Sequence, residues 1–487
     1  MLINIHLNPK VAEIKDQEEK FDTLISPSST VATLLNIEKE LGRNDIIGID
    51  EAFPGEAETK NKIRRLIEND ISEGKITALL FTLLLYNSER TLKYIEELKH
   101  VFGEKIKIII GGQLVPLARE AYLKNKNIDA VCVGDAEKIL PELLRDLEVG
   151  NLKGEYAGWV MNEKEKKFSG VSFDHFWQIK ERMETQKKEV GFSQLTIQGP
   201  GGPGCAWAIS SMKGPCSFCS LQNVEVKSEM TIEEYLENER VLEQQFHPDR
   251  FYDVANQFIP SVSPHEKVEW LKKYIEIRKA KGIKAEKYAY LTVPSVDAEV
   301  AELLKEAGIS EVYLGIDHFS EEALKQENKS FRKRETLEKC LNALKSNGIS
   351  FRAGIVLGSA EESLETLESV RNGVRWMTEN YRDIIKAVGI FPIEMLPGSK
   401  DFEKMREAGL CPGLFVKFDE SGYLSRDEQR EMTNSWIDSH SNVSAKEVRE
   451  FETEMFDYLK SEGVFGYSVD RKPEQANEFK GVEGKLK

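Results

Sequence analysis

The stretch LTIQGPGGPGCAWAISSMKGPCSFCSLQ, residues 195–222, decides the fold, because it places three cysteines directly after a short β-branched run. Cys205 follows a cluster of glycines and prolines, and Cys216 and Cys219 form a C-x-x-C motif. Three of the six cysteines of the chain therefore lie within fifteen residues. Disulfides rarely persist in reducing compartments, and thiolates grouped in this way bind a metal ion or an iron–sulfur cluster.

Two kinds of metal centre fit this pattern. A closed zinc site needs four ligands, and the nearest histidines, His175 and His247, are too distant for finger-like spacing. Three thiolates would leave one iron of a [4Fe–4S] cluster without a protein ligand, and that iron would be open to chemistry. The alternative is a zinc knuckle or redox pair completed by Cys132, Cys340 or Cys411.

The C-x-aromatic-C ending of a loop after a first strand resembles the radical S-adenosylmethionine (SAM) superfamily. In that family three cysteines hold a [4Fe–4S] cluster, and SAM binds the fourth iron through its amino and carboxylate groups. The resemblance implies that Cys205, Cys216 and Cys219 are the metal ligands. The first spacing departs from the family pattern, because ten residues separate Cys205 from Cys216 where three are usual. Longer first spacings occur in the Elongator-type tRNA-modifying enzymes of the superfamily.

Residues 1–150 alternate short apolar runs with amphipathic stretches. This rhythm predicts βαβ units and a doubly wound parallel sheet, whose ligands bind beyond the carboxyl ends of the strands. We expect the residues at those ends to bind a cofactor. They are Asn8, Asp50, Thr82, Ser88, Gly111, Gly112, Gln113, Gly134, Asp135 and Glu137.

Two of these strand ends, IIIGGQLVPL and VCVGDAEKILPELL, resemble the cobalamin-binding domain that precedes many radical SAM domains. At paired glycines the missing Cβ would let the backbone approach a ligand. A bulky side chain at Gly112 is therefore expected to exclude the ligand and to leave the fold largely intact. The D-x-H-x-x-G motif that supplies a histidine to cobalt is absent, so the resemblance implies cobalamin without a histidine ligand. A domain that has lost its ligand is the alternative.

The whole chain reads as an α/β protein in four parts. A Rossmann-like cobalamin-binding domain (1–150) is followed by a connector (151–190), a partial (β/α)6 radical SAM barrel (191–400) and an acidic helical region with a disordered tail (401–487). The barrel is predicted from six successive strand and helix signals. Barrels of this type carry their chemistry at the C-terminal rim of the strands.

Four segments of the barrel resemble rim segments of the superfamily in their order: FYDVANQF, GIDHFSEEAL, FRAGIVLGSAEES and IEMLPGSKDF. The resemblance implies that Asp253 and Asn256 face the barrel mouth. Asp317 could accept from the ammonium or ribose of SAM, and Arg352 could pair with its carboxylate; an exterior, solvated Arg352 is the alternative. Asp253 and His318 are the catalytic candidates, and His318 reads as a proton donor, a polar rim residue or a structural histidine.

Charge and hydropathy bear on the partners. The formal net charge of −16 opposes a nucleic-acid partner. No apolar run of about 20 residues is present, so no membrane span is expected. No signal peptide is evident at the first residues, and we expect a cytoplasmic protein.

The resemblance implies a cobalamin-dependent radical SAM enzyme, most simply a methyltransferase acting on an unactivated carbon of a small molecule, lipid or peptide. The cluster would reduce SAM to a 5′-deoxyadenosyl radical, cobalamin would donate methyl, and flavodoxin or ferredoxin would supply electrons. A cyclase or rearrangement enzyme, an RNA-modifying enzyme and a non-catalytic cobalamin or iron–sulfur carrier are the alternatives.

Overall fold

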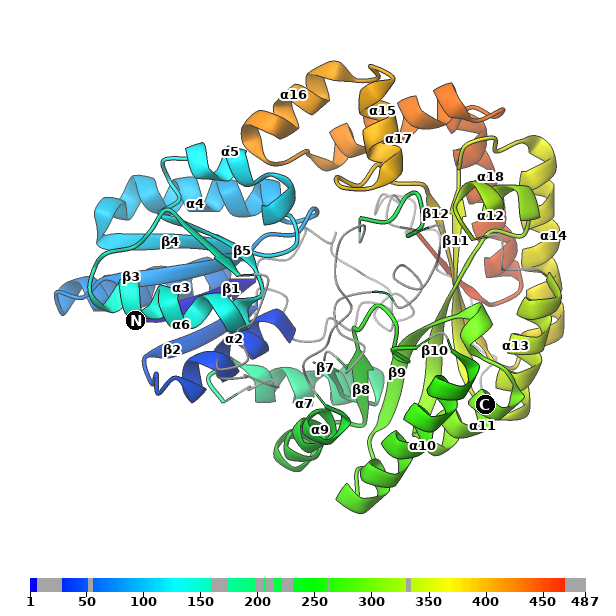
Figure 1. Ribbon diagram of the computed structural model, residues 1–487, viewed down its shortest axis with the longest axis horizontal. Helices are drawn as coiled ribbons and strands as arrows, with labels where there is room; N and C mark the ends of the chain where they lie inside the picture. The colour runs from blue at the N-terminus through cyan, green and yellow to red at the C-terminus, as the bar shows by residue number, and fades with distance from the viewer. Residues whose placement is uncertain are drawn as a thin grey trace.

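The computed structural model describes residues 1–6, 29–50, 56–158, 174–197, 199, 205, 214–220, 231–261, 263–329 and 334–468. The predicted cofactor residue Asn8 and the predicted disordered tail, residues 474–487, lie outside them. The described part holds two parallel sheets. Figure 1 shows them side by side, with helices α15, α16 and α17 lying across from one to the other.

The first sheet is the doubly wound sheet expected at the N-terminal end of the chain. Its described strands are all parallel, in the order β2-β1-β3-β4-β5-β6. They are β1 (Leu2–His6), β2 (Ile46–Asp50), β3 (Thr77–Thr82), β4 (Ile106–Gly111), β5 (Ala130–Gly134) and β6 (Glu155–Gly158). Strands such as β3 are buried throughout and apolar between their terminal threonines, because parallel sheets are buried on both faces.

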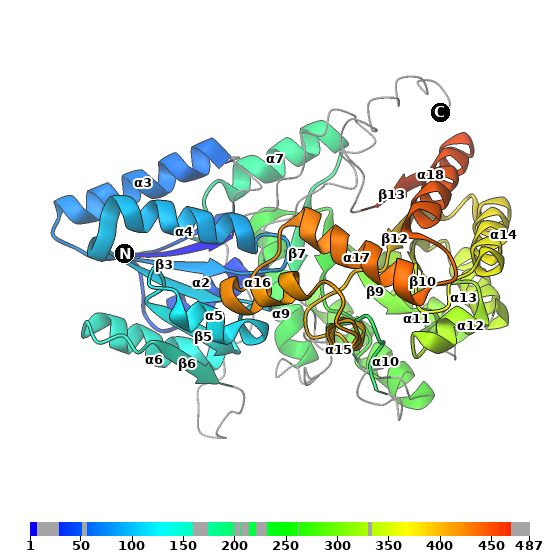
Figure 2. The same ribbon diagram turned by 90° about the horizontal axis from the view of Figure 1, so that it is seen from above.

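Helices cover both faces of this sheet, as Figure 2 shows, with α3 and α4 on one side and α6 on the other. The helices are α2 (Ser29–Glu40), α3 (Glu56–Ser72), α4 (Ser88–Phe102), α5 (Arg119–Lys124) and α6 (Ala136–Glu148). Strand β6 lies after the boundary expected at residue 150 and pairs with β5 of the first sheet. The connector bonds to the edge of the sheet, where Trp177 N–H donates to Gly48 O at 2.9 Å, and then forms α7 (Ile179–Val190).

The second sheet is the predicted partial barrel, with one strand more than expected. Among the described residues it has seven parallel strands in the order β13-β12-β11-β10-β9-β8-β7. They are β7 (Gln194–Ile197), β8 (Arg250–Asp253), β9 (Glu286–Thr292), β10 (Ile309–Asp317), β11 (Ser350–Leu357), β12 (Ile385–Pro392) and β13 (Phe465–Tyr467). The extra strand, β13, comes from the region that was expected to be helical only.

The helices of the barrel pack on the outer face of this sheet. They are α9 (Ile232–Phe246), α10 (Pro264–Lys281), α11 (Ala298–Glu306), α12 (Glu321–Gln326), α13 (Arg334–Ser346) and α14 (Leu364–Tyr381). None of the helices in the described ranges is long and apolar enough to cross a lipid bilayer.

The C-terminal helices are α15 (Lys400–Glu407), α16 (Pro412–Ser421), α17 (Arg426–His440) and α18 (Ala445–Ser461). Capping boxes begin α17, at Ser425, and α18, at Ser444. The region contacts the first domain where Tyr122 Oη donates to Gly422 O at 2.6 Å. Gly422 has φ 77°, and a Cβ there would lie 2.4 Å from the Tyr122 ring, so this contact requires glycine.

A buried carboxyl group lies inside the first domain. Glu38 of α2 accepts a 2.8 Å hydrogen bond from Asn4 of β1, and neither side chain is accessible to solvent. Burial raises the pKa of Glu38 to about 8, although the Asn4 hydrogen bond lowers it. The folded domain therefore binds a proton at Glu38 that the unfolded chain releases near pH 4.5.

This difference makes the domain less stable as the pH rises from about 4.5 to about 8, by up to roughly 1.4 kcal/mol per pH unit. A Glu38→Gln protein keeps an acceptor for Asn4 and carries no titrating group. The quantity to compare is the free energy of unfolding of Glu38→Gln minus that of the wild type. We expect this difference to be larger at pH 8 than at pH 5. Urea denaturation followed by circular dichroism measures this. Glu40→Gln, on the exposed face of the same helix, is the control. If the effect of Glu38→Gln on stability does not change with pH, Glu38 does not have a raised pKa in the folded protein.

Candidate functional site

The cysteine loop leaves the barrel at the carboxyl end of β7, and its last part is a compact turn. Cys219 N–H donates to Cys216 O at 3.2 Å, so the structure brings these two residues together. Cys205, Cys216 and Cys219 are all partly exposed. Within the described ranges no group of three or more Cys, His, Asp or Glu side chains is gathered as a metal site. The position of Cys205 beside the other two therefore remains a prediction.

Two segments of the barrel rim hold this cysteine turn, residues 214–220. Asn328 Nδ2 donates to Pro215 O at 3.2 Å, and Asp401 N–H, at the start of α15, donates to Ser217 O at 3.1 Å. Lys329 Nζ lies 4.5 Å from the ring centroid of Phe218, inside the C-x-x-C motif. The turn is thus fixed from both sides, with an ammonium group stacked on its aromatic ring.

Lys329 pairs with Asp317, the predicted ligand of SAM. The Nζ–Oδ2 distance is 2.6 Å, and both residues are buried. Asp317 ends β10 at φ 66°, a left-handed conformation that costs roughly 1–3 kcal/mol in a residue other than glycine. Such strain is typical of functional sites. The sequence gives no reason to select Lys329 as a site residue. Its position over Phe218 depends on the path of the chain after the short helix α12.

Glu327, two residues before Lys329, is a buried carboxyl group that sequence reasoning also missed. It is 1% exposed, and the described residues offer neither of its carboxyl oxygens a hydrogen-bond partner. Burial raises its pKa to about 8, which Lys329 opposes and the carboxylates of Glu362 and Asp401 reinforce. Leaving a buried polar group unsatisfied is expensive, so a ligand with a cationic or donor group would relieve a cost here.

His318, a catalytic candidate, is held inside the protein. It is 2% exposed, and its Nδ1 accepts the Ser320 N–H at 2.9 Å, at the start of α12. Its Nε2 lies 3.3 Å from Glu362 Oε1 without hydrogen-bond alignment. Burial alone would raise the pKa of Glu362, but the His318 imidazole, the Thr366 hydroxyl and the Gly358 N–H outweigh it and lower that pKa. These contacts fix the orientation of the His318 ring, and its catalytic role remains a prediction.

Asp253 does not face the barrel mouth as expected. Side chains alternate along β8, and Tyr252 contacts Tyr290 of the neighbouring β9, whereas Asp253 points to α9 and is fully buried. Asp253 Oδ2 accepts the Tyr235 hydroxyl at 3.0 Å, and Oδ1 accepts the N–H of Gly199 at 2.8 Å. Asn256, also expected at the mouth, is exposed in the loop that follows.

Arg352 is inside the barrel, so the exterior, solvated alternative is wrong. It is 7% exposed and its Nε pairs with Glu311 of β10. Arg250 Nη1 lies 2.7 Å from the other oxygen of Glu311, which completes a buried Arg–Glu–Arg triad. Glu311 thus already binds the guanidinium that was predicted to meet the SAM carboxylate.

The predicted cofactor residues of the first domain divide into buried and accessible ones. Asp50, Thr82 and Ser88 are buried, and Ser88 Oγ donates to Leu85 O. Gly111, Gly134 and Asp135 are partly exposed, and Asp135 pairs with Lys138 at 2.9 Å. Gly112 and Gln113 are exposed at the carboxyl end of β4. The side chain of Glu137 lies outside the described part of the chain.

Two of the glycines at these strand ends are required by the chain itself. A Cβ on Gly112, which has φ 111°, would lie 2.5 Å from Leu83 O, and one on Gly134, which has φ 120°, would lie 2.3 Å from Gly158 O. A Cβ on Gly111 would meet only an ordinary contact, 3.7 Å from Cys132. The expectation that a bulky residue at Gly112 leaves the fold largely intact is therefore wrong, because backbone occupies the space.

The accessible edge of the first sheet is joined to the barrel rim by three side chains. Tyr86, in the loop after β3, donates its hydroxyl to Glu394, which follows β12. Arg426, at the start of α17, donates to the other oxygen of Glu394 at 2.7 Å and lies 5.3 Å from the Tyr86 ring centroid. The carboxyl ends of both sheets therefore border one region of the molecule.

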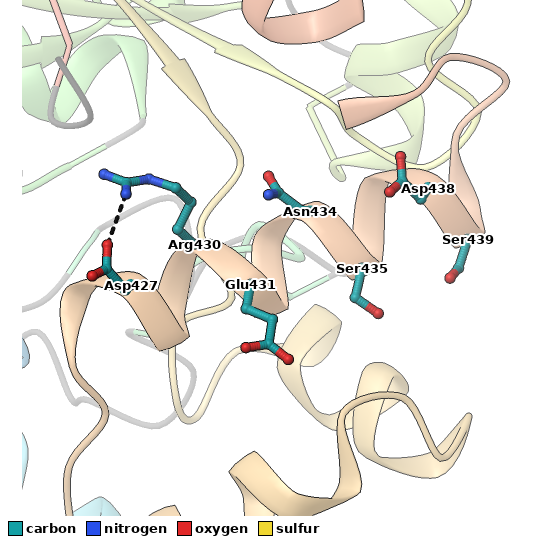
Figure 3. Close-up of a pocket in the computed structure, with 7 residues that line it drawn as sticks. All are labelled: Asp427, Arg430, Glu431, Asn434, Ser435, Asp438 and Ser439. Atoms are coloured by element: carbon teal, nitrogen blue, oxygen red, sulfur yellow. Dashed lines mark hydrogen bonds and ion pairs between the residues drawn. The ribbon is translucent and has the colours of Figure 1, made fainter. Parts of the chain in front are cut away.

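A groove of about 480 Å³ lies along α17 (Figure 3). All its lining residues come from one helix: Asp427, Arg430, Glu431, Asn434, Ser435, Asp438 and Ser439. No residue of the cysteine turn or of the strand ends lines it. We do not assign the function to this groove.

The strand-end glycines provide a stability test. Gly112→Ala should destabilise the first domain by roughly 2 kcal/mol or more, through strain at positive φ and collision with the Leu83 backbone. Gly111→Ala, one residue earlier, is the control and should change stability little. Thermal unfolding followed by circular dichroism measures both. Equal melting temperatures for the two variants would show that the backbone contact is unimportant.

Comparisons with known proteins agree with this architecture. Residues 200–372 match the model of the radical SAM superfamily. A sequence comparison with curated proteins gave no match.

Three solved structures share the fold. The radical SAM methyltransferase TsrM from Kitasatospora setae, with cobalamin and a [4Fe–4S] cluster, is 14% identical, with a TM-score of 0.61 over 84% of this chain and 75% of that one. Its complex with tryptophan substrate and the SAM analogue aza-SAM has a TM-score of 0.59 at 16% identity, over 80% of this chain and 72% of that one. The cobalamin-dependent SAM radical enzyme OxsB is 13% identical, with a TM-score of 0.58 over 95% of this chain and 62% of that one. Residues 200–372 are therefore similar to the radical SAM superfamily, and the chain shares its overall fold with the solved structures of TsrM and OxsB.

Proposed function

We propose that this protein is a cobalamin-dependent radical SAM enzyme, and that it methylates a carbon of a small-molecule or peptide substrate. The observation that carries the proposal is the cysteine turn at the barrel rim, with Lys329 on its aromatic ring and the buried, unsatisfied carboxyl of Glu327 two residues before Lys329. The fold shared with TsrM, whose structure is described as a methyltransferase, supports the reaction class. The substrate and the site of methylation are part of the proposal.

The donor set fits an iron–sulfur cluster. Cys205, Cys216 and Cys219 would ligate three irons, since thiolates are the ligands that iron–sulfur clusters use, and the fourth iron would be left for SAM. When bound, the cluster and SAM would supply one-electron cleavage of the sulfonium, and cobalamin would supply the methyl group. The protein's part is to hold these groups and to exclude water.

The charges beside the cysteine turn fit the methionyl end of SAM. Lys329 would donate to its carboxylate, and Glu327 would accept from its ammonium, which would satisfy an oxygen that now lacks a partner. Asp317 would remain as the partner of Lys329 and as an acceptor for ribose hydroxyls. His318 and Asp253 would act through the elements they fix, and neither would touch the substrate.

The exposed edge at Gly112 and Gln113 would receive cobalamin. Doubly wound sheets bind ligands at the carboxyl ends of their strands, and the contact of Tyr86 with Glu394 places this edge near the barrel rim. Electrons would come from a flavodoxin or ferredoxin in a reducing compartment such as the cytoplasm. The net charge of −16 disfavours an RNA substrate.

Anaerobic turnover tests the function. With SAM, reductant and hydroxocobalamin, the reconstituted protein should form 5′-deoxyadenosine and, when methyl is transferred, S-adenosylhomocysteine, both separated by liquid chromatography. Single Cys→Ala changes at 205, 216 and 219 should abolish 5′-deoxyadenosine and lower bound iron. The same change at Cys132 or Cys411 should leave both unaltered. Cluster binding and SAM cleavage by Cys205→Ala would refute the proposed ligand set.

The charge pair at the turn allows a binding test. Lys329→Met should weaken SAM binding by about 10- to 100-fold, because a charge-assisted hydrogen bond contributes roughly 1.5–3 kcal/mol. The iron content should stay the same. Calorimetric titration of the reconstituted protein with SAM measures the Kd. Lys404→Met, an exposed lysine of α15, is the control. An unchanged Kd in Lys329→Met would remove Lys329 from the SAM site.

A further inference from the structure

The start of the cysteine loop is tied to the barrel wall through one buried carboxylate. Gly199, two residues beyond β7, donates its N–H to Asp253 Oδ1 at 2.8 Å, and Ala255 N–H donates to the same oxygen at 2.9 Å. A Cβ on residue 199 would lie 2.0 Å from Asp253 Oδ2. Only glycine allows the chain to approach the carboxylate so closely, so the contact fixes the chain path six residues before Cys205.

Asp253 is itself held by a network of buried polar groups on α9 and β9. Tyr235 donates its hydroxyl to Asp253 Oδ2 at 3.0 Å, and Lys287 contacts both the Tyr235 hydroxyl and Glu239. All four side chains are at most 2% exposed. Buried charges are tolerated only when they are paired and hydrogen-bonded, so the network admits few other arrangements. The carboxylate that receives Gly199 is therefore rigidly placed.

The other end of the loop is fixed as well, because Asn328 and Asp401 bond to the cysteine turn. Cys205 stands between these two anchors. The two anchors, at Gly199 and Pro215, bracket Cys205 and the ten residues that follow it, so together they limit the loop-closure entropy that is lost when Cys205 approaches Cys216.

We propose that Asp253 is a positioning residue for the third thiolate: by anchoring the loop at Gly199, it sets where Cys205 stands relative to Cys216 and Cys219. The proposal rests on the proposed cluster, and it explains how a loop with an unusually long first spacing could present three thiolates together. It also gives Asp253 a role that its burial allows.

Asp253→Ala and Asp253→Asn separate positioning from general stability. Asparagine keeps an oxygen that can accept from Gly199 and Ala255, whereas alanine removes it. After anaerobic reconstitution, Asp253→Ala should hold at least threefold less [4Fe–4S] cluster than the wild type, measured by iron, sulfide and electron paramagnetic resonance. Asp253→Asn should hold nearly as much as the wild type. Asp297→Ala, which removes the cap of α11 and the partner of Lys267, is the matched control and should not change cluster content.

A measurement on the metal-free protein separates this inference from the proposed function. In a Cys219→Ser background, mild oxidation should form the Cys205–Cys216 disulfide, detected by peptide mass spectrometry, because a disulfide needs Cα atoms within about 7 Å. The rate should fall at least fivefold on adding Asp253→Ala and change little with Asp253→Asn. A fall confined to alanine supports the anchor even if no cluster forms, in which case only the proposed function fails.

Three results would overturn the inference. One is a folded Asp253→Ala protein with the cluster content and disulfide rate of the wild type. Another is equal losses in the alanine and asparagine variants. If Asp253→Ala does not fold, Tyr235→Phe replaces it, since it removes only the hydroxyl that holds Oδ2. In Tyr235→Phe, a fall in cluster content and in disulfide rate that is smaller than the one expected for Asp253→Ala would support the anchor. The third overturning result would be no change in either quantity in Tyr235→Phe.

Discussion

Parallel strand pairing is the constraint on which this molecule depends. Every described strand pair in both sheets is parallel, so each strand is followed by a crossover that returns the chain to the same end. All carboxyl ends of a sheet consequently meet at one edge, and loops that are distant in sequence become neighbours. The cysteine turn, the end of β10 and the start of α15 meet in this way. The contact of Tyr86 with Glu394 then brings the edge of the first sheet beside them.

The fold was predictable because its strongest signals are local. The strands of the first sheet are largely apolar, and the two runs of alternating strands and helices stand out in the sequence. The strand β13 did not stand out, because three residues after a long helical region carry no periodicity.

The candidate site was less predictable from the sequence than the fold. A one-residue error in the predicted register reverses the side of the sheet that a residue faces. For this reason the direction of Asp253, which points to α9, was not predicted from the sequence. Arg352 lies on the inner face, where Glu311 binds it. Lys329 and Glu327 depend on how a six-residue helix folds back, which no local pattern encodes.

Charge inside the barrel is organised in pairs that join different elements. Glu311 joins β8 to β11 through Arg250 and Arg352, Glu239 joins α9 to β9 through Lys287, and Asp317 joins β10 to the segment after α12 through Lys329. Removing one member of such a pair leaves an uncompensated charge, so these contacts specify positions more than they add stability. Glu327 differs from these pairs, because within the described residues neither oxygen of its buried carboxyl has a hydrogen-bond partner.

The strand β13 has a consequence for how the chain is made. It pairs with β12 through Ala387–Phe465, Val388–Gly466 and Gly389–Tyr467, and more than seventy residues of helices and loops separate the two strands. During synthesis the edge of β12 thus emerges from the ribosome well before its partner. An open strand edge can pair with another chain, and partly folded states of large proteins aggregate through such edges. A ribosome stalled within α15–α18 would present an incomplete barrel, and we would expect chaperones to associate with the nascent protein at that stage.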